Sequence, residues 1–285
     1  VELMFLDVET SSSINSSPNI ADINSDGKKE IIFGTESGIL YVIDSSGKSL
    51  WKYKTEGPIR GSPLVQRFAN KQSGIFFGSL DKNLYFLNNE GTLLWKYKSK
   101  DGIESCPALA LTKDQPLIIF GSNDGTIYAL DLKGQLIWEY QTKGKITAQA
   151  VHIKLTEKSE PIILIGSTDG TMYCLTEKGK LIWEYNTEGA ICSKATVEDI
   201  NKDGKKEIIF GSCDCKVYTL DYQGKKIWSY QTDFWVVATP IVTDLDDDGR
   251  LEIVIGSYDH NIYVLDSEGS YVLDYVPGVS GIVAQ

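Results

Sequence analysis

The sequence predicts an all-β protein made of six repeated units, and three recurring features carry this prediction. A glycine closes an apolar run once per unit, every 43 to 45 residues, at Gly34, Gly78, Gly121, Gly166, Gly211 and Gly256. A tyrosine stands seven residues after each of these glycines, from Tyr41 to Tyr263. In five units a tryptophan follows a further glycine by four residues, at Trp51, Trp95, Trp138, Trp183 and Trp228.

Each unit reads as four short strands separated by turns. An apolar run such as "KEIIFGS" precedes "TIYALD", whose alternation predicts a strand exposed on one face. A tryptophan strand such as "QLIWEYQT" and a strand such as "SPLVQRF" complete the unit, and the "N-D-G" and "T-D-G" turns tolerate positive φ. Four strands in about 45 residues predict a β-propeller blade, in which the tryptophans wedge between adjacent blades.

The two ends of the sequence decide the expected number of blades. "LMFLDVET" (3–10) resembles the tryptophan strand with Phe5 in the tryptophan position, and "SYVLDYV" (270–276) is a second degenerate copy with Leu273 there. Six complete repeats plus these partial terminal strands favour seven blades, with six as the alternative. We treat residues 1–285 as a single β-propeller domain, and Val1 in place of Met agrees with a piece trimmed from a slightly longer chain.

Composition excludes some partners. The formal net charge is −11 and the pI is near 4.8, which argue against nucleic acid or anionic lipid as partners. No apolar run approaches the roughly 18 residues that a membrane span requires, and we expect a monomer. Five cysteines without framework spacing leave the redox compartment open. Cys213 and Cys215 flank Asp214 in a hairpin turn. We consider three alternatives for them: incidental thiols, a redox-active or strained disulfide pair, or a metal site.

Three loops share an acidic pattern that runs straight into an apolar strand: "DINSDGKKE", "DINKDGKKE" and "DLDDDGRLE". Positions one, three and five offer side-chain oxygens, the glycine permits a sharp turn, and the final carboxylate can bind through both oxygens. Ca²⁺ takes six to eight such oxygens, and this is the ligand logic of the EF-hand with a shorter closing spacing. The predicted ligands, including the backbone carbonyls of the three basic residues, are Asp22, Asn24, Asp26, Lys28, Glu30, Asp199, Asn201, Asp203, Lys205, Glu207, Asp244, Asp246, Asp248, Arg250 and Glu252.

The alternative interpretation of these loops is a plain turn before a strand. The second, third and fourth units test it, because Gln66, Leu109 and Lys154 stand there in place of the first aspartate and an equally apolar strand still follows. The turn therefore does not require the acidic pattern. We expect the ions to be structural, one per loop, and their number favours the cell surface or another extracytoplasmic compartment, where calcium is millimolar.

A ligand, if there is one, is expected at the channel mouth, where the first strands of the units converge. The residues placed at or near the start of these strands vary from unit to unit, as a binding site on a regular scaffold would. The alternative is a water-filled channel lined by tolerated residues. In "TDFWVVATP", Phe234 and Trp235 replace small residues and suit a planar ligand, a partner protein or a channel plug. The predicted binding residues are Asn15, Arg60, Glu104, Thr147, Cys192, Lys194 and Trp235.

"GSNDGTIYALDLKGQLIWEY" resembles the pyrroloquinoline-quinone-like β-propeller repeat, whose tryptophan-docking phrase Ala129, Asp131, Gly134 and Trp138 follow with one residue fewer in the turn. The resemblance covers nearly the whole chain, and the acidic loops separately resemble the calcium loops of FG-GAP-type repeats. The quinoprotein-like family includes quinone-dependent dehydrogenases and an outer-membrane assembly lipoprotein that is a binding scaffold. Many of those dehydrogenases use adjacent cysteines, which this chain lacks.

These observations predict a non-catalytic, calcium-stabilised scaffold that binds a protein or small ligand at the channel mouth. The alternative function is a pyrroloquinoline-quinone-dependent oxidoreductase. In that case the resemblance implies that the quinone lies near Arg60, Glu104, Lys194 and Trp235. The sequence shows no catalytic constellation.

Overall fold

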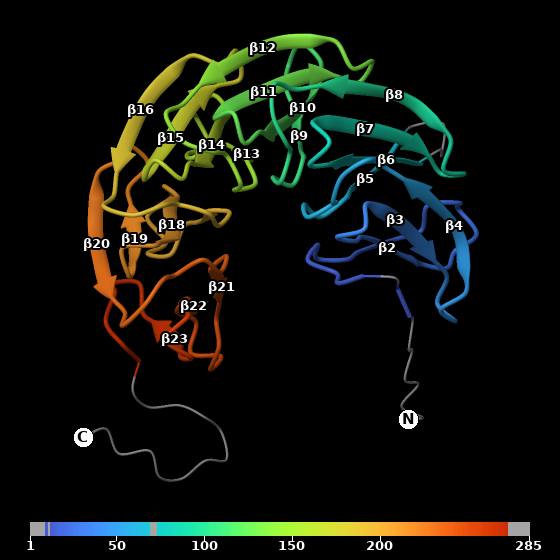
Figure 1. Ribbon diagram of the computed structural model, residues 1–285. Coiled ribbons are helices and arrows are strands. Elements are labelled where there is room, and N and C mark those ends of the chain that lie inside the picture. Colours follow the sequence, from blue (N-terminus) through green and yellow to red (C-terminus); the bar gives the residue numbers. More distant parts are fainter. Residues whose placement is uncertain (1–8, 11, 69–72, 273–285) are drawn as a thin grey trace. The chain divides into compact units, whose positions relative to one another are not determined.

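The computed structural model describes residues 9, 10, 12–68 and 73–272, and these form strands and turns without a helix. The chain divides into two compact units, Val1–His152 and Ile153–Gln285. Each unit consists of antiparallel sheets that follow one another in sequence order (Figure 1). In the described part of the chain, no helix has the length and apolar character that crossing a bilayer requires.

The first unit holds three four-stranded sheets, in each of which the strands pair in chain order. The first sheet is β1 (Asn19–Ala21), β2 (Glu30–Gly34), β3 (Ile39–Ile43) and β4 (Ser49–Lys54). The second is β5 (Leu64–Arg67), β6 (Ser73–Gly78), β7 (Asn83–Asn88) and β8 (Leu93–Lys98). The third is β9 (Ala108–Leu111), β10 (Pro116–Gly121), β11 (Thr126–Asp131) and β12 (Leu136–Gln141).

The second unit continues the same plan. Its first sheet is β13 (Val151–Ile153), which includes the boundary between the units, with β14 (Ile162–Gly166), β15 (Thr171–Thr176) and β16 (Leu181–Asn186). The next is β17 (Thr196–Glu198), β18 (Glu207–Ser212), β19 (Lys216–Leu220) and β20 (Lys226–Gln231). The last has three described strands, β21 (Ile241–Thr243), β22 (Glu252–Gly256) and β23 (Ile262–Leu265).

The third strand of the third repeat is more buried than its sequence pattern predicts. Strand β11, "TIYALD", was expected to expose one face, but its residues 126–130 are all buried. Tyr128 and Leu130 pack in an apolar cluster with side chains of the second sheet, and Ile127 and Ala129 are also completely buried, whereas β12, the last strand of the sheet, is half exposed. Alternation of residue types in β11 therefore reflects small and large core side chains rather than a solvent face.

Buried apolar clusters join neighbouring sheets within each unit. In the first unit, Ile32 and Leu40 of the first sheet pack with Ile75 and Phe77 of the second. In the second unit, Ile209 packs with residues of the last sheet, again through completely buried side chains. A four-stranded sheet on its own would leave these faces in water, so adjacent sheets stabilise one another.

Four of the five repeated tryptophans, Trp51, Trp95, Trp183 and Trp228, lie between adjacent sheets of one unit, as predicted. The indole N–H of Trp51 donates a hydrogen bond of 2.9 Å to the carbonyl of Asn89 in the turn between β7 and β8. Trp95 and Trp228 bond Leu132 and Ser267 of their following sheets at 3.0 Å each. Each ring lies on the glycine of the contacted turn, and Trp183 covers its glycine in the same way; the glycines are Gly91, Gly134, Gly269 and Gly224.

The choice between seven and six blades depends on Phe5 and Leu273, which lie outside the described residues. Six sheets are present in the part of the chain that the structure describes. The two counts therefore remain predictions, as does the treatment of the chain as a single domain.

Candidate functional site

The three acidic loops adopt one backbone conformation. They connect the first and second strands of their sheets, β1–β2, β17–β18 and β21–β22. The fourth residue of each loop has a positive φ of 61–64°, and the glycine two residues later has a φ of 84–86°; these residues are Ser25, Lys202, Asp247, Gly27, Gly204 and Gly249. Three sequences that differ in composition thus fold into the same tight turn.

The first aspartate of each loop holds this turn closed. The N–H of Gly27 donates to Asp22 Oδ2 at 3.1 Å. The same bond runs from Gly204 to Asp199 at 2.8 Å and from Gly249 to Asp244 at 2.9 Å. One oxygen of each carboxylate is therefore committed to the backbone.

The closing glutamates Glu30, Glu207 and Glu252 are buried carboxylates, with exposures of 2, 3 and 7%. Oε2 of each accepts a backbone N–H from the second loop residue, at 2.8–3.0 Å. Burial, with Asp203 and Asp199 adding repulsion, raises the pKa of Glu207 above its ordinary value. No ion pair among the described residues includes any of the three. A buried carboxylate without a cationic partner is costly, and a cation bound in the loop would offset that cost.

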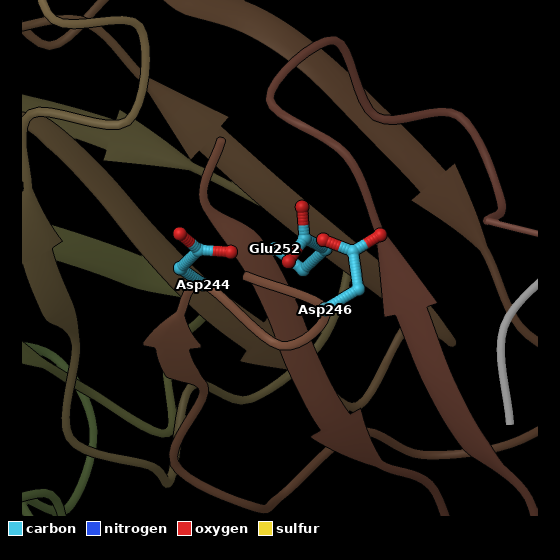
Figure 2. Close-up of side chains that lie close together, drawn as sticks. All are labelled: Asp244, Asp246 and Glu252. Atoms are coloured by element: carbon cyan, nitrogen blue, oxygen red, sulfur yellow. The ribbon is translucent and has the colours of Figure 1, made fainter. Parts of the chain in front are cut away.

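The third loop gathers three carboxylates. One oxygen from each of Asp244, Asp246 and Glu252 lies within 4.8 Å of the others, and Figure 2 shows the three groups turned toward a common space. Oδ1 of Asp244 is buried and has no hydrogen-bond partner. In the described part of the chain this is the one group of three acidic, histidine or cysteine side chains that meets this spacing. Three hard oxygens with a buried unpaired member fit a hard cation such as Ca²⁺.

The first and second loops carry asparagine at the third position, and this changes the local contacts. Asn24 Nδ2 donates to Asp26 Oδ2 at 3.3 Å, whereas Asn201 Nδ2 donates to Glu207 Oε1 at 3.4 Å. The amide nitrogen thus lies beside an oxygen that a cation would use. Binding in these two loops requires the amide to turn away from that oxygen, a rearrangement that the third loop does not need.

Basic side chains lie at the edge of two of the loops. Lys205 Nζ is 3.8 Å from Asp203 Oδ2, and Arg250 Nε is 3.9 Å from Asp248 Oδ2. These pairs are largely exposed and therefore contribute little. The backbone carbonyls predicted as ligands, from Lys28, Lys205 and Arg250, remain predictions.

Three of the four predicted channel-mouth residues of the first unit, Asn15, Arg60 and Glu104, take part in a series of polar contacts. Arg60 bonds Glu36 through Nε at 2.8 Å and through Nη2 at 3.1 Å, and its Nη1 is 3.4 Å from Glu104. Asn15 donates to Glu36 at 2.7 Å, and Asn123 donates to Glu104 at 2.8 Å. This series of contacts joins loop residues that lie next to strands of all three sheets of the unit.

Two residues in this series of contacts, Glu36 and Asn123, were not predicted from the sequence. Each stands two residues after a repeat glycine, Gly34 or Gly121, in the turn between the second and third strands. The variation at that position, where other units have Leu80 or Cys213, was the signal that could have identified it.

The predicted position of the mouth residues needs a correction. Asn15, Arg60 and Glu104 were expected to start the first strands, but β1, β5 and β9 begin four residues later. In each case a proline immediately precedes the strand, at Pro18, Pro63 and Pro107. Thr147 and Cys192 were expected at the same position and likewise precede β13 and β17 by four residues, although alanines, Ala150 and Ala195, stand directly before those strands. The offset therefore does not depend on proline, and the mouth residues lie in the loop before the strand.

The remaining predicted binding residues have separate environments. Thr147, in the first unit, has a buried hydroxyl with no hydrogen-bond partner. In the second unit Lys194 is exposed and Cys192 is partly exposed. The Trp235 ring stacks on Phe234, with centroids 5.2 Å apart, and each is 45% exposed. The structure does not bring the seven predicted residues together as one site, so their joint role remains a prediction.

The series of polar contacts in the first unit is not arranged for acid catalysis. Bonding to Arg60 is the largest influence on Glu36 and lowers the pKa of this carboxyl, the reverse of what a general acid needs near neutrality. All five cysteines are free, so Cys213 and Cys215 do not form a disulfide in this structure. No observation on the described residues favours the oxidoreductase alternative.

Comparisons with known proteins agree with the fold. A family model described as the lambda-carrageenase beta-propeller domain matches residues 4–105, 117–197 and 182–276. BamB from Moraxella catarrhalis is one of the similar solved structures, with a TM-score of 0.70 and 18% identity over 92% of this chain and 74% of that one. No curated protein matches the chain. These similarities confirm the β-propeller prediction, and at this identity the structural likeness speaks for the fold alone.

Proposed function

The chain belongs to the lambda-carrageenase beta-propeller domain family, and we propose that it acts as a calcium-stabilised, non-catalytic scaffold. The observation that carries the proposal is the third acidic loop, where Asp244, Asp246 and Glu252 converge around a buried oxygen without a partner. A calcium ion there would neutralise carboxylates that otherwise repel one another. We extend the proposal to the first two loops because their turns are the same.

The proposed role of the ions follows from where the loops are placed. Each loop joins the first strand of a sheet to the second, and its closing glutamate is the first residue of the second strand. In the first sheet, for example, Glu30 pairs with Ala21, the last residue of β1. An ion held by the loop would tie these two strands together. Because only the folded chain would bind the ion, binding would increase the free energy of unfolding, and the ion would have no part in catalysis.

A binding role for the loop surface rests on side chains without a catalytic arrangement. The exposed stack of Phe234 and Trp235 provides the large, rigid aromatic area that protein interfaces use as anchors. In the first unit, Arg60 and its two glutamates offer a polar surface that varies between repeats. A protein is the partner that we favour, and a small ligand is the alternative. Nucleic acid is disfavoured by the net charge of −11.

We also propose that the repeats are of the pyrroloquinoline-quinone-like type and that the acidic loops correspond to FG-GAP-type calcium loops. The sequence phrases and the common loop conformation support this assignment. An extracytoplasmic location suits it, because millimolar calcium there would fill even weak sites.

The family name favours one second candidate, hydrolysis of lambda-carrageenan. This chain is acidic, and its half-buried glutamates Glu36 and Glu104 are held by Arg60. A sulfated polysaccharide would therefore meet repulsion, and the lowered pKa of Glu36 provides no proton donor. These features place the scaffold role ahead of a hydrolase.

Thermal melts in EGTA, in calcium and in magnesium test the proposal. Calcium at a hundredfold excess over its Kd should add about 2.7 kcal/mol per site to the free energy of unfolding, a clear rise in Tm. Magnesium should give a smaller rise because it demands a stricter octahedral geometry. An unchanged Tm in calcium would contradict the stabilising role.

Two additions to the same samples test the catalytic alternatives. Pyrroloquinoline quinone should add no second shift in Tm, and lambda-carrageenan should release no reducing ends. A quinone shift with dye reduction, or release of reducing sugar, would replace the scaffold proposal with an enzyme, whatever the response to calcium.

A further inference from the structure

Two loops of the first unit show how this repeat brings a particular pair of side chains into contact. The N–H of Glu36 bonds the carbonyl of Ser13 at 3.0 Å, and the side chains of Asn15 and Glu36 bond each other at 2.7 Å. In the third sheet the N–H of Asn123 bonds the carbonyl of Gly102, and Asn123 then bonds Glu104. In both loops, the residue two positions after the one whose carbonyl accepts the bond (Asn15 or Glu104) contacts the residue that donates the N–H (Glu36 or Asn123).

In the sheet β17–β20 the same connection places two thiols in this relationship. The N–H of Cys213 bonds the carbonyl of Ala190 at 2.9 Å, which makes Cys192 the partner of Cys213. In the two loops of the first unit the side chains in these positions are 2.7 and 2.8 Å apart, and Cys192 is also close enough to contribute to the raised pKa of the Cys213 thiol. Both are free and partly exposed, so a small reagent can reach them.

We propose that Cys192 and Cys213 are a redox-active dithiol that closes to a disulfide when the folded protein meets a small disulfide oxidant such as glutathione disulfide. The bond would fasten the loop before β17 to the turn between β18 and β19. This inference is independent of calcium binding and of any partner of the scaffold.

The chemistry balances in two exchange steps. The thiolate of Cys192 attacks one sulfur of glutathione disulfide, forming a mixed disulfide and releasing one glutathione thiolate. The thiolate of Cys213 then attacks Cys192 Sγ, forming the protein disulfide and releasing the second glutathione. Two protein thiols are oxidised, one glutathione disulfide is reduced to two thiols, and the two protons pass to the released thiolates.

The order of attack follows from the environment of Cys213. Burial, with further contributions from Cys192, Asp214 and Cys215, raises the pKa of the Cys213 thiol to about 11. Little Cys213 thiolate is present near neutral pH, so we assign the first attack to Cys192. The second step is intramolecular, and the backbone hydrogen bond between Cys213 and Ala190 holds the two segments together.

Cys215 is the competing partner in sequence, but the hairpin holds it elsewhere. Its φ is 66°, and its carbonyl accepts hydrogen bonds from the N–H and hydroxyl of Thr232. Ser212 and Lys216 pair across this turn. A Cys213–Cys215 bond would have to deform a turn that the neighbouring strand fixes, whereas the loop that carries Cys192 is already hydrogen-bonded to Cys213.

The test treats the full chain, folded and calcium-loaded, with glutathione disulfide, alkylates the remaining thiols and maps tryptic peptides by mass spectrometry. Cys192 lies in peptide 181–194, and Cys213 and Cys215 share peptide 207–216. We expect the two peptides to be cross-linked with the loss of two hydrogen atoms. Buried Cys174 monitors folding because it should resist alkylation until denaturant is added.

Three variants identify the bonded pair. Cys215→Ser should keep the cross-link, whereas Cys192→Ser and Cys213→Ser should lose it and acquire glutathione adducts instead. A bond within peptide 207–216, or stable glutathione adducts on both Cys192 and Cys213 of the unmodified chain, would overturn the proposal. So would an equal cross-link in Cys192→Ser made through another cysteine.

Discussion

The N–H of Ile200 donates a hydrogen bond of 3.0 Å to Oε2 of Glu207, a carboxylate that is only 3% exposed. Glu30 and Glu252 accept the same bond from Ile23 and Leu245. Neither this N–H nor the longer bond of 3.4 Å from Asn201 Nδ2 brings a positive charge to the buried carboxylate. The recurrence of a buried carboxylate without an ion pair, three times at the end of an acidic loop, is the physical basis for the calcium proposal.

Replacing the closing glutamate should separate the role of the metal from that of the hydrogen bond. Glu252→Gln keeps an oxygen for the N–H of Leu245 but removes the charge. We expect this variant to lose the part of the calcium-induced rise in Tm that the third loop supplies, while its Tm in EGTA changes little or increases. Differential scanning calorimetry with and without calcium measures both quantities.

Glu90→Gln is the matched control, because Glu90 is an exposed residue of the turn between β7 and β8. Its calcium response should equal that of the unmodified chain. If Glu252→Gln also responds to calcium like the unmodified chain, the third loop does not hold the ion.

The effect of calcium should grow with pH. Burial raises the pKa of Glu207, so the folded state binds this proton more tightly than the unfolded state does. In EGTA the resulting stabilisation is present below the ordinary pKa of 4.5 and is lost as pH rises through the raised value. Calcium must displace the same proton, and the calcium-induced rise in Tm should therefore be smaller near pH 5 than near pH 7.5.

The variant Glu207→Gln provides the comparison for this pH effect. It cannot titrate at this position, so its Tm in EGTA should fall less between these two pH values. A calcium effect that is larger at the acidic pH would contradict the assignment of the proton and the ion to one carboxylate.

The repeated tyrosine is stabilised by an aspartate that lies in the preceding turn. The hydroxyl of Tyr218 donates to Asp214 Oδ2 at 2.7 Å, and this oxygen also accepts the N–H of Glu188 from the preceding sheet's loop. Tyr218→Phe should lower the free energy of unfolding by about 1.5–3 kcal/mol, the usual contribution of a hydrogen bond to a charged group. Chemical denaturation measures the loss.

The first repeat supplies the matched substitution. Four residues before Tyr41 stands Ser37, where the repeat of Tyr218 has Asp214, so Tyr41→Phe removes no hydroxyl–carboxylate bond. We expect it to cost less than Tyr218→Phe. Equal losses in the two variants would show that the hydroxyl–carboxylate bond is not what the tyrosine contributes.

Gly134 is required both by its backbone and by the tryptophan above it. Its φ is 81°, and a Cβ there would lie 2.8 Å from the Trp95 ring. Gly27 has a similar φ of 86° but has no atom within 4 Å of such a Cβ. Both alanine variants should therefore pay about 1–2 kcal/mol for the left-handed backbone, and Gly134→Ala should lose about a further 1–3 kcal/mol through the overlap.

Denaturation of the two alanine variants in EGTA makes this comparison, since Gly27 belongs to a calcium loop. A Gly27→Ala variant as unstable as Gly134→Ala would mean that backbone strain alone accounts for both. The position of the tryptophan between sheets would then contribute little to stability.

The repeat itself was predictable because its markers perform the same structural task in every unit. The tryptophan needs a turn glycine in the next sheet, as Trp95 needs Gly134, and such a requirement leaves a regular trace in the sequence. The acidic loops were predictable for the same reason, since Asp22 and Gly27 must be five residues apart to close the turn.

Contacts between side chains from different repeats were not predictable in this way. Glu36 meets Arg60 from the following repeat, and neither residue type recurs at its position. The proposed pairing of Cys192 with Cys213 was not predicted for a similar reason, because the nearby Cys215 suggested a local pair. The burial of both faces of β11 also depends on neighbouring sheets, and alternation along one strand carries no information about them.

Isothermal titration of the metal-free protein with calcium tests the central claim most directly. The account predicts saturable binding that approaches three ions per chain, and loss of one ion in the variant Glu252→Gln. Binding that is absent at millimolar calcium would contradict the account and leave the three acidic loops as turns. Binding with unchanged stoichiometry in Glu252→Gln would contradict the assignment of an ion to the third loop.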